Sequence, residues 1–213
     1  MSLFITGTDT GVGKTHIAAR VLHLLRASGA RCAGMKPICC GDRRDAERLL
    51  AAGSDGLSID DVNPVWLKTP AAPIVGSLME KASIDVEKIL ASFQTLQERV
   101  EHVIVEGTGG WLVPIRPDYF VSDLAAAMKL PVLVVAQNRL GCLNSCGAYS
   151  AQRCRIRAAL HRSCIEQHRN GERYSGVNER RYSQADSQCS VACWIRGKPD
   201  GTPRGLATYA RVD

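Results

Sequence analysis

The stretch that decides the fold is Gly7-Thr8-Asp9-Thr10-Gly11-Val12-Gly13-Lys14-Thr15. It follows a short apolar segment, Leu3-Phe4-Ile5, and precedes a helical pattern, which is the context of a phosphate-binding loop. Glycines let backbone N–H groups turn toward phosphate oxygens, and the helix N-terminus adds partial positive charge. The lysine can reach the outer phosphates and the next threonine can bind magnesium. The usual spacing places a glycine at position 8, where this chain has threonine, and a glycine-rich turn without a ligand is the alternative interpretation.

Length, charge and cysteine content bound the class of protein. A chain of 213 residues can bury a substantial core, and no apolar run reaches membrane-spanning length. The N-terminus leads into the first strand without a signal peptide, so we expect a cytoplasmic protein whose nine cysteines are thiols. The net charge of +6 is unevenly placed: residues 1–144 hold 15 basic and 15 acidic side chains, and residues 145–213 hold 12 and 6. We therefore expect two segments, 1–144 and 145–213.

The first segment alternates short apolar strands with helices. Nearly continuous apolar strands separated by helices indicate an α/β fold, with a mostly parallel central sheet flanked by helices. Three prolines between residues 53 and 77 predict a loop there, and residues 39–42 are expected to form a turn. The expected strands are 3–5, 31–36, 102–106 and 131–137; the expected helices are one from the phosphate loop to Gly29, with Ile17, Val21, Leu24 and Leu25 on its apolar face, then 46–52, one capped by Ser83 with an apolar stripe from Val86 to Leu96, and 123–128.

Gly7, Lys36, Glu106 and Asn138 each follow the carboxyl end of a predicted strand, where open α/β sheets bind ligands. Glu106 can organise magnesium, or it can accept hydrogen bonds from the glycine turn that follows it. Asp45 can complete a magnesium site, although alone it also fits a surface helix position. A second lysine at the phosphates, Lys36, would supply charge for a developing oxyanion; the plainer interpretation is an exposed lysine at a strand end.

Four motifs in this order carry a family resemblance. They are Thr6-Gly7-Thr8-Asp9-Thr10-x-Val12-Gly13-Lys14-Thr15, Lys36-Pro37, Glu106-Gly107-x-Gly109-Gly110-Trp111 and Leu140-Gly141-Cys142-Leu143-Asn144. Together they resemble dethiobiotin synthetase over residues 2–144, a P-loop NTPase-like family. The early glycine at position 7 is part of that family's own pattern, which accounts for the unusual spacing.

The resemblance implies a homodimeric, ATP-dependent enzyme that closes a ureido ring on 7,8-diaminopelargonate with carbon dioxide. An amine of the substrate becomes a carbamate, the carbamate attacks the γ-phosphate of Mg-ATP, and the second amine displaces phosphate. Lys36 is the implied catalytic lysine, with Lys14 sharing its charge, and Thr10 and Cys40 face the substrate, with Cys40 standing where serine is common. The implied magnesium ligands are Thr15, Asp45 and Glu106. The implied nucleotide-binding residues are Gly11, Val12, Gly13, Lys14, Thr15, His16, Asp45, Glu106, Gly107, Thr108 (where alanine is common) and Gly109.

Residues 145–213 depart from the family pattern and are rich in arginine, serine and cysteine. Hardly an apolar residue occurs between Gln167 and Gln188, and we expect this atypical C-terminal third of the chain to be poorly ordered. Three interpretations compete. The segment is a zinc module built from Cys189, Cys193 and an upstream histidine, His161 or His168; a basic nucleic-acid arm, which its scattered charges disfavour; or a frameshifted translation, which the abrupt change favours.

Two functional alternatives to the synthetase stay open. One is a regulatory P-loop ATPase related to the partitioning switches, which carry a second lysine early in the phosphate loop. The corresponding residues here, Thr8-Asp9-Thr10, contain no lysine. The other is an inactive, frameshifted product. We expect small-molecule partners, and neither a membrane nor a nucleic acid.

Overall fold

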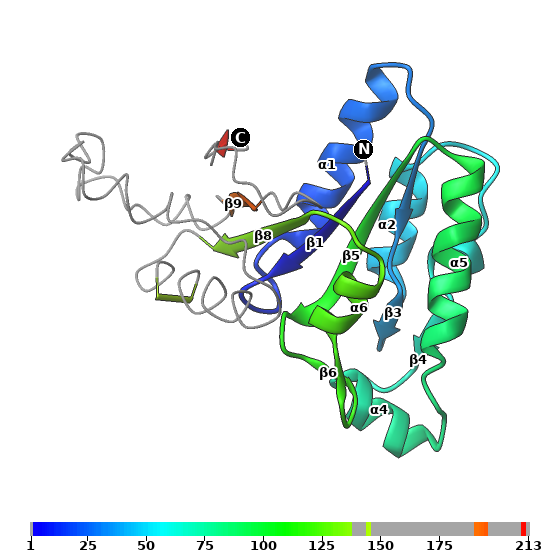
Figure 1. The fold of residues 1–213 in the computed structure, drawn as a ribbon, viewed down its shortest axis with the longest axis vertical. Coiled ribbons are helices and arrows are strands. Elements are labelled where there is room, and N and C mark those ends of the chain that lie inside the picture. Colours follow the sequence, from blue (N-terminus) through cyan, green and yellow to red (C-terminus); the bar gives the residue numbers. More distant parts are fainter. Residues whose placement is uncertain (1, 138–143, 146–189, 196–209, 212–213) are drawn as a thin grey trace.

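The computed structural model describes residues 2–137, 144–145, 190–195 and 210–211. Its main sheet has the strand order β10-β9-β8-β1-β5-β2, of which Figure 1 labels β9, β8, β1 and β5. β1 lies between β5 and β8, and these strands and β2 run parallel, whereas β9 and β10 are antiparallel additions. The strands are β1 (Leu3–Gly7), β2 (Cys32–Met35), β5 (His102–Gly110), β8 (Val132–Gln137), β9 (Ser190–Ile195) and β10 (Ala210–Arg211).

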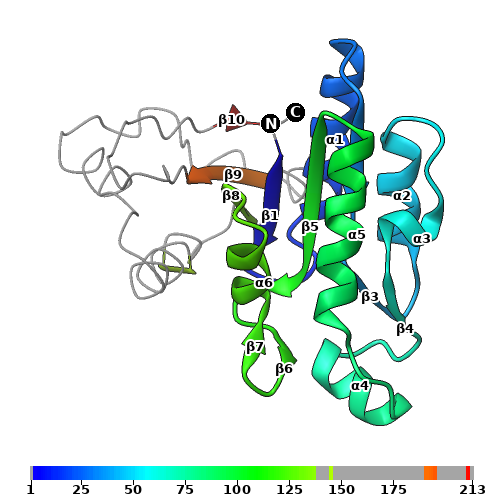
Figure 2. The same cartoon turned by 45° about the vertical axis from the view of Figure 1, so that its right-hand side comes forward.

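Helices cover both faces of this sheet, because alternate strand residues point to opposite sides. Leu3 and Ile5 pack in one core with α1 (Lys14–Ala27) and α2 (Arg44–Ala52). Phe4 packs in the other core with α5 (Val86–Arg99) and α6 (Val121–Ala127). Figure 2 shows α5 and α6 in front of the sheet, with α1 and α2 on its other side. The predicted α/β fold with a mostly parallel, helix-flanked sheet is confirmed.

The region from 53 to 77, predicted to be a loop, instead contains regular elements. Its prolines lie at element boundaries rather than within elements: Pro73 occupies the first turn of α4, where a missing N–H costs nothing. Residues 39–42 also differ from the predicted turn, since Cys39 and Cys40 end a strand that pairs with β4 in parallel. The additional elements are β3 (Ile38–Cys40), α3 (Ile59–Val62), β4 (Val65–Leu67), α4 (Pro73–Glu80), β6 (Pro114–Arg116) and β7 (Tyr119–Phe120).

Two helix predictions need correction in detail. In α1 the buried stripe runs through Ile17, Ala18 and Leu22, whereas Leu24 is 60% exposed, because the face in contact with the sheet is narrower than the run of apolar residues. α5 begins two residues later than expected, and its N-cap is Asp85, whose carboxylate accepts a hydrogen bond from the Lys88 N–H at 2.9 Å. The predicted buried stripe of α5 is confirmed.

Much of the second segment lies outside the described residues. So do Asn138, most of the fourth motif and three of the proposed zinc ligands, Cys189, His161 and His168. β9 and β10 are regular elements that the sequence analysis did not assign. None of the helices in the described part of the chain combines the length and apolar character needed to cross a membrane.

Candidate active site

The phosphate loop joins the end of β1 to the start of α1. Gly11 and Gly13 have φ angles of 76° and 97°, a region that side chains with a Cβ rarely adopt. Gly7 is needed for a different reason: a Cβ there would lie 2.7 Å from Val12 Cγ2 and 3.0 Å from Lys14 Cδ. The close approach of the loop to the end of β1 therefore explains a glycine at position 7 instead of position 8.

A cavity of about 690 Å³ opens at the carboxyl ends of β1, β2 and β5. Of the predicted site residues, two do not line it. Val12 is buried in the core on the α1 side, and Gly107 lies against Phe4 with its carbonyl 3.5 Å from Lys36 Nζ. The predicted residues that line the cavity are Thr10, Gly11, Gly13, Lys14, Thr15, His16, Lys36, Cys40, Asp45, Glu106, Thr108 and Gly109.

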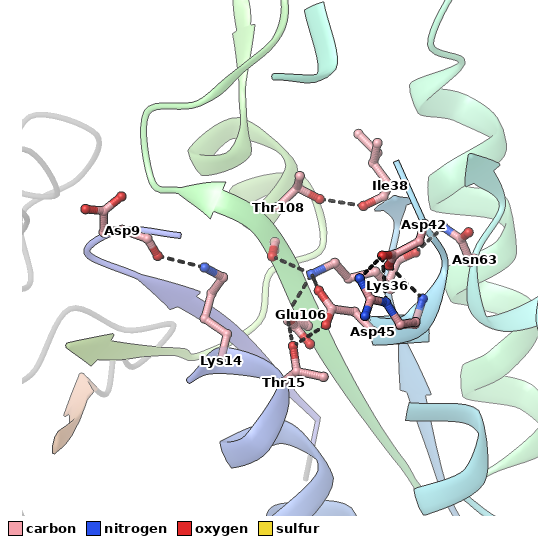
Figure 3. A network of polar contacts seen from close by, with 12 residues as sticks. Asp9, Lys14, Thr15, Lys36, Ile38, Asp42, Asp45, Asn63, Glu106 and Thr108 are labelled. Carbon is pink, nitrogen blue, oxygen red and sulfur yellow. Dashed lines mark hydrogen bonds and ion pairs between the residues drawn. The ribbon is translucent and has the colours of Figure 1, made fainter. Parts of the chain in front are cut away.

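Lys36 is the centre of a polar network in this cavity (Figure 3). Its Nζ donates to Glu106 Oε1 at 2.6 Å and to Asp45 Oδ2 at 3.1 Å. Thr15 Oγ1 lies 2.9 Å from a carboxylate oxygen of each of these acids. Lys36 is only 4% exposed, so it is not the surface lysine of the plainer interpretation.

The electrostatics of this network follow from burial and charge pairing. Burial by itself would lower the pKa of Lys36, but the charges of Glu106 and Asp45 and their hydrogen bonds outweigh it, and the pKa is raised. Burial likewise opposes ionisation of Asp45, yet Lys36 and the hydrogen bond from Thr15 keep the pKa of Asp45 below its ordinary value. Near neutral pH the network holds a cation between carboxylates.

Lys14 sits on the other side of the cavity in a different environment. Its Nζ donates to the backbone carbonyl of Asp9 at 2.9 Å, and Figure 3 shows the side chain directed toward this loop. Burial lowers the pKa of Lys14, and repulsion from Lys36 lowers it further. Within the described part of the chain, Lys14 is therefore hydrogen-bonded to a neutral carbonyl and not to a carboxylate.

The oxygen atoms of Thr15, Asp45 and Glu106 fit a magnesium ion. Glu106 Oε2 is buried and has no hydrogen-bond partner among the described residues, which leaves a carboxylate oxygen available as a ligand. Magnesium prefers a few carboxylate oxygens with water and phosphate oxygens as the remaining ligands. Among the described residues there is no cluster of three or more His, Cys, Asp or Glu side chains able to hold a metal.

Several cavity residues were missed by the sequence analysis. Ile38 is one of the missed residues. Its carbonyl accepts a hydrogen bond from the predicted Thr108 Oγ1 at 2.6 Å, which connects β3 to β5 at the cavity wall. Arg48 follows Asp45 by three residues on α2, so helical spacing from Asp45 could have identified it. Another part of the wall comes from residues 70–73 at the start of α4, where the sequence pattern predicts a loop. The missed lining residues are Ile38, Cys39, Asp42, Arg48, Pro70, Ala71, Ala72, Pro73 and Val113.

The cysteines of β3 are buried to different degrees beside Lys36. Cys39 is buried in the core on the α1 side, whereas Cys40 is half-buried. Burial raises the pKa of each thiol to about 11, and the charge of Lys36 opposes this shift. Cys40 is therefore a neutral thiol near pH 7, and a thiol forms weaker hydrogen bonds than a hydroxyl group.

Comparisons with known proteins identify the family of this chain. A family model described as an AAA domain matches residues 1–168. The ATP-dependent dethiobiotin synthetase BioD of Akkermansia muciniphila is 45% identical over 143 residues, 67% of each chain. Proteins of the same name from Aromatoleum aromaticum and Methanococcus vannielii are 41% and 38% identical over 149 and 142 residues, 66% and 67% of each chain. The matches thus span about two thirds of each relative, and the chain belongs to the dethiobiotin synthetase family of ATP-dependent ligases.

Proposed function

We propose that this protein converts 7,8-diaminopelargonate, carbon dioxide and ATP into dethiobiotin, ADP and phosphate. The observation that carries the proposal is the buried Lys36, paired with Glu106 and Asp45 beside a phosphate loop. A simple nucleotide-binding loop needs one lysine. Burying the charge of a second lysine, Lys36 at 4% exposure, costs free energy, and a functional role would account for that cost. A reaction that develops negative charge beyond the γ-phosphate supplies such a role.

In the proposed reaction, one amine of the substrate and carbon dioxide form a carbamate. A carbamate oxygen bonds to the γ-phosphorus as the bond to ADP breaks, which gives a carbamic–phosphoric anhydride. The second amine then attacks the carbonyl carbon, phosphate leaves and the ring closes. Lys36 stabilises the carbamate and the transferring phosphoryl group, and Lys14 shares the charge that develops on the phosphates.

Nucleotide phosphates bind along Gly11 to His16, with residues 106–109 on the other side. Thr15, Asp45 and Glu106 would hold magnesium, which when bound supplies positive charge to the phosphate oxygens. Thr15 Oγ1 lies 2.9 Å from both Asp45 Oδ1 and Glu106 Oε1, so oxygen atoms of all three residues already lie close together. The unpartnered Glu106 Oε2 supports this assignment.

In this proposal Thr10 and Cys40 contact the substrate. An apolar wall formed by Ile38, Val113 and residues 70–73 suits the alkyl chain of the substrate. A homodimer is also part of the proposal. The exposed apolar side chains Leu78 and Met79 on α4 are consistent with a subunit contact.

Phosphate release from Mg-ATP tests this function, measured with and without diaminopelargonate and bicarbonate. Release that requires both and falls to a small residual rate in Lys36→Ala is the expected result. Lys88→Ala, which removes an exposed lysine of α5, is the matched control and should retain activity. Release that is indifferent to diaminopelargonate would favour the regulatory ATPase, and the absence of release from folded protein would favour an inactive product.

For residues 145–213 we propose a frameshifted translation joined to an intact N-terminal two thirds of the family sequence. The matches to relatives cover about two thirds of this chain, which supports the proposal. Resequencing the locus tests it: a shifted frame near codon 145 is expected, and a continuous frame in independent isolates would contradict it.

A further inference from the structure

Asn63 is a buried polar residue outside the cavity, only 1% exposed. Its Nδ2 donates to the carbonyls of Lys36 and Val65, each at 2.8 Å. Its Oδ1 accepts a hydrogen bond from Arg43 Nε at 2.9 Å. The side-chain amide thus uses two donors and one acceptor at once, a combination that a carboxylate or an apolar side chain of similar size lacks.

The backbone of Lys36 depends on this region and not on the main sheet. The pairing of β2 with β5 ends at Met35, one residue before Lys36. The Lys36 N–H donates to the Val62 carbonyl at 2.8 Å, and the Lys36 carbonyl accepts from Asn63. The next residue, Pro37, has no N–H to contribute. Residues 62 and 63 therefore hold both backbone polar groups of Lys36.

Arg43 in turn holds Asn63. Besides the bond to Oδ1, its Nη2 donates to the Asn63 carbonyl at 3.0 Å and to Asp60 Oδ1 at 2.9 Å. The guanidinium lies 5.2 Å from the ring centre of Trp66, which itself donates to the Gly41 carbonyl. Arg43 also immediately precedes α2, the helix that carries Asp45. One guanidinium thus connects the anchor of Lys36 to the helix of its carboxylate partner.

We propose that Asn63, held by Arg43, is a positioning residue for Lys36. A lysine side chain is long and flexible, so the 2.6 Å and 3.1 Å contacts of its Nζ require a fixed backbone. Buried, fully satisfied polar networks supply such rigidity, and a displacement of about 1 Å in a catalytic group costs up to about 100-fold in rate. The inference rests on the proposed function, in which Lys36 stands beside the reacting groups.

Asn63→Asp tests the inference because it preserves the shape of the side chain and removes both donors. Arg43→Lys is the second variant, which keeps the charge and loses the planar fork. Ile89→Val and Ile89→Ala, at a buried position of α5 that does not line the cavity, control for lost stability. Each variant is measured for kcat and for the KM of ATP, in the wild-type and in the Lys36→Ala background.

We expect Asn63→Asp to lower kcat by about 10- to 100-fold while the KM of ATP stays within about threefold. On the Lys36→Ala background the same substitution should cause no further loss, because the residue that it positions is gone. A loss no greater than that of the Ile89 controls, or an equal factor in both backgrounds, would overturn the inference. If Asn63→Asp does not fold, Arg43→Lys decides the same comparison.

A second readout separates the inference from the proposed function. The rate of Lys36 acylation in the unliganded protein, measured by mass spectrometry relative to Lys14, needs no catalytic activity. Faster relative labelling of Lys36 in Asn63→Asp supports positioning, and unchanged relative labelling overturns it. If the wild-type protein shows no diaminopelargonate-dependent phosphate release, the proposed function fails while this measurement still decides the role of Asn63.

Discussion

Lys14 and Lys36 are two buried lysines of one cavity whose pKa values are shifted in opposite directions. Both side chains are nearly inaccessible, at 6% and 4% exposure. Lys14 bonds to a neutral carbonyl, and its pKa is lowered by burial and by the second lysine. Lys36 bonds to two carboxylates, which raise its pKa against the effect of burial. Burial therefore sets a common cost, and the nearest charges decide the outcome.

The largest expected effect is the difference between removing one lysine and removing the other. Lys36→Met should lower the free energy of unfolding by about 3–5 kcal/mol, because it leaves the buried Glu106 carboxylate without its cation. Lys14→Met should cost about 1 kcal/mol or less, since it removes one hydrogen bond to a neutral carbonyl. Urea unfolding of both variants measures the difference. Equal losses would show that the carboxylates do not distinguish the two regions.

A second substitution at Glu106 should restore part of this loss in one background only. Glu106→Gln in Lys36→Met removes the unpaired charge, and we expect it to recover about 2 kcal/mol. In Lys14→Met the same change should add to the single effects within about 0.5 kcal/mol. The three single variants (Lys36→Met, Lys14→Met and Glu106→Gln), the two double variants and the wild type form two double-mutant cycles. Similar interaction energies in the two cycles would contradict the comparison.

Acid pH should expose a smaller difference through Asp45. Its lowered pKa means that its contribution to stability is present above the ordinary value of 3.8 and is lost as pH falls through the folded pKa. Because Lys36 is a main cause of that shift, Lys36→Met should begin to lose this contribution at a higher pH than the wild type. Lys14→Met should follow the wild type. Melting temperatures between pH 6 and pH 2.5, with Asp45→Asn as a reference that lacks the transition, measure this.

The smallest expected effect is on the thiol of Cys40. The charge of Lys36 opposes the rise of this pKa to about 11, so Lys36→Met should slow alkylation of Cys40 near pH 9 by about twofold. Lys14→Met should leave the rate unchanged. Cys39, which is fully buried, reports in the same sample on any opening of the structure. A change in both thiols together would indicate loss of stability and not loss of charge.

Local sequence patterns predicted the elements whose chemistry is local. The strand–loop–helix unit around Lys14 follows from glycine placement and from the apolar residues on either side, and the structure has it where it was expected. The buried stripe of α5 was predicted because the helical spacing of its apolar residues is also a local pattern. The 53–77 region was predicted wrongly, because its short α3 and β4 are stabilised by contacts with β2 and β3 and not by their own periodicity.

The sequence by itself determined that a phosphate loop, a second lysine and an acid would meet the same edge of a parallel sheet, because the carboxyl ends of parallel strands share an edge. Only the tertiary structure decided that Lys36 is buried between Asp45 and Glu106. It also brings Thr15 into contact with Glu106, which lies 91 positions away in the chain. It also decided the contacts of Asn63 with Lys36 and Arg43, which no local pattern around this asparagine indicates. Spacing along the chain encodes which strand ends carry a functional group, whereas long-range packing sets the distances and the burial that fix its charge.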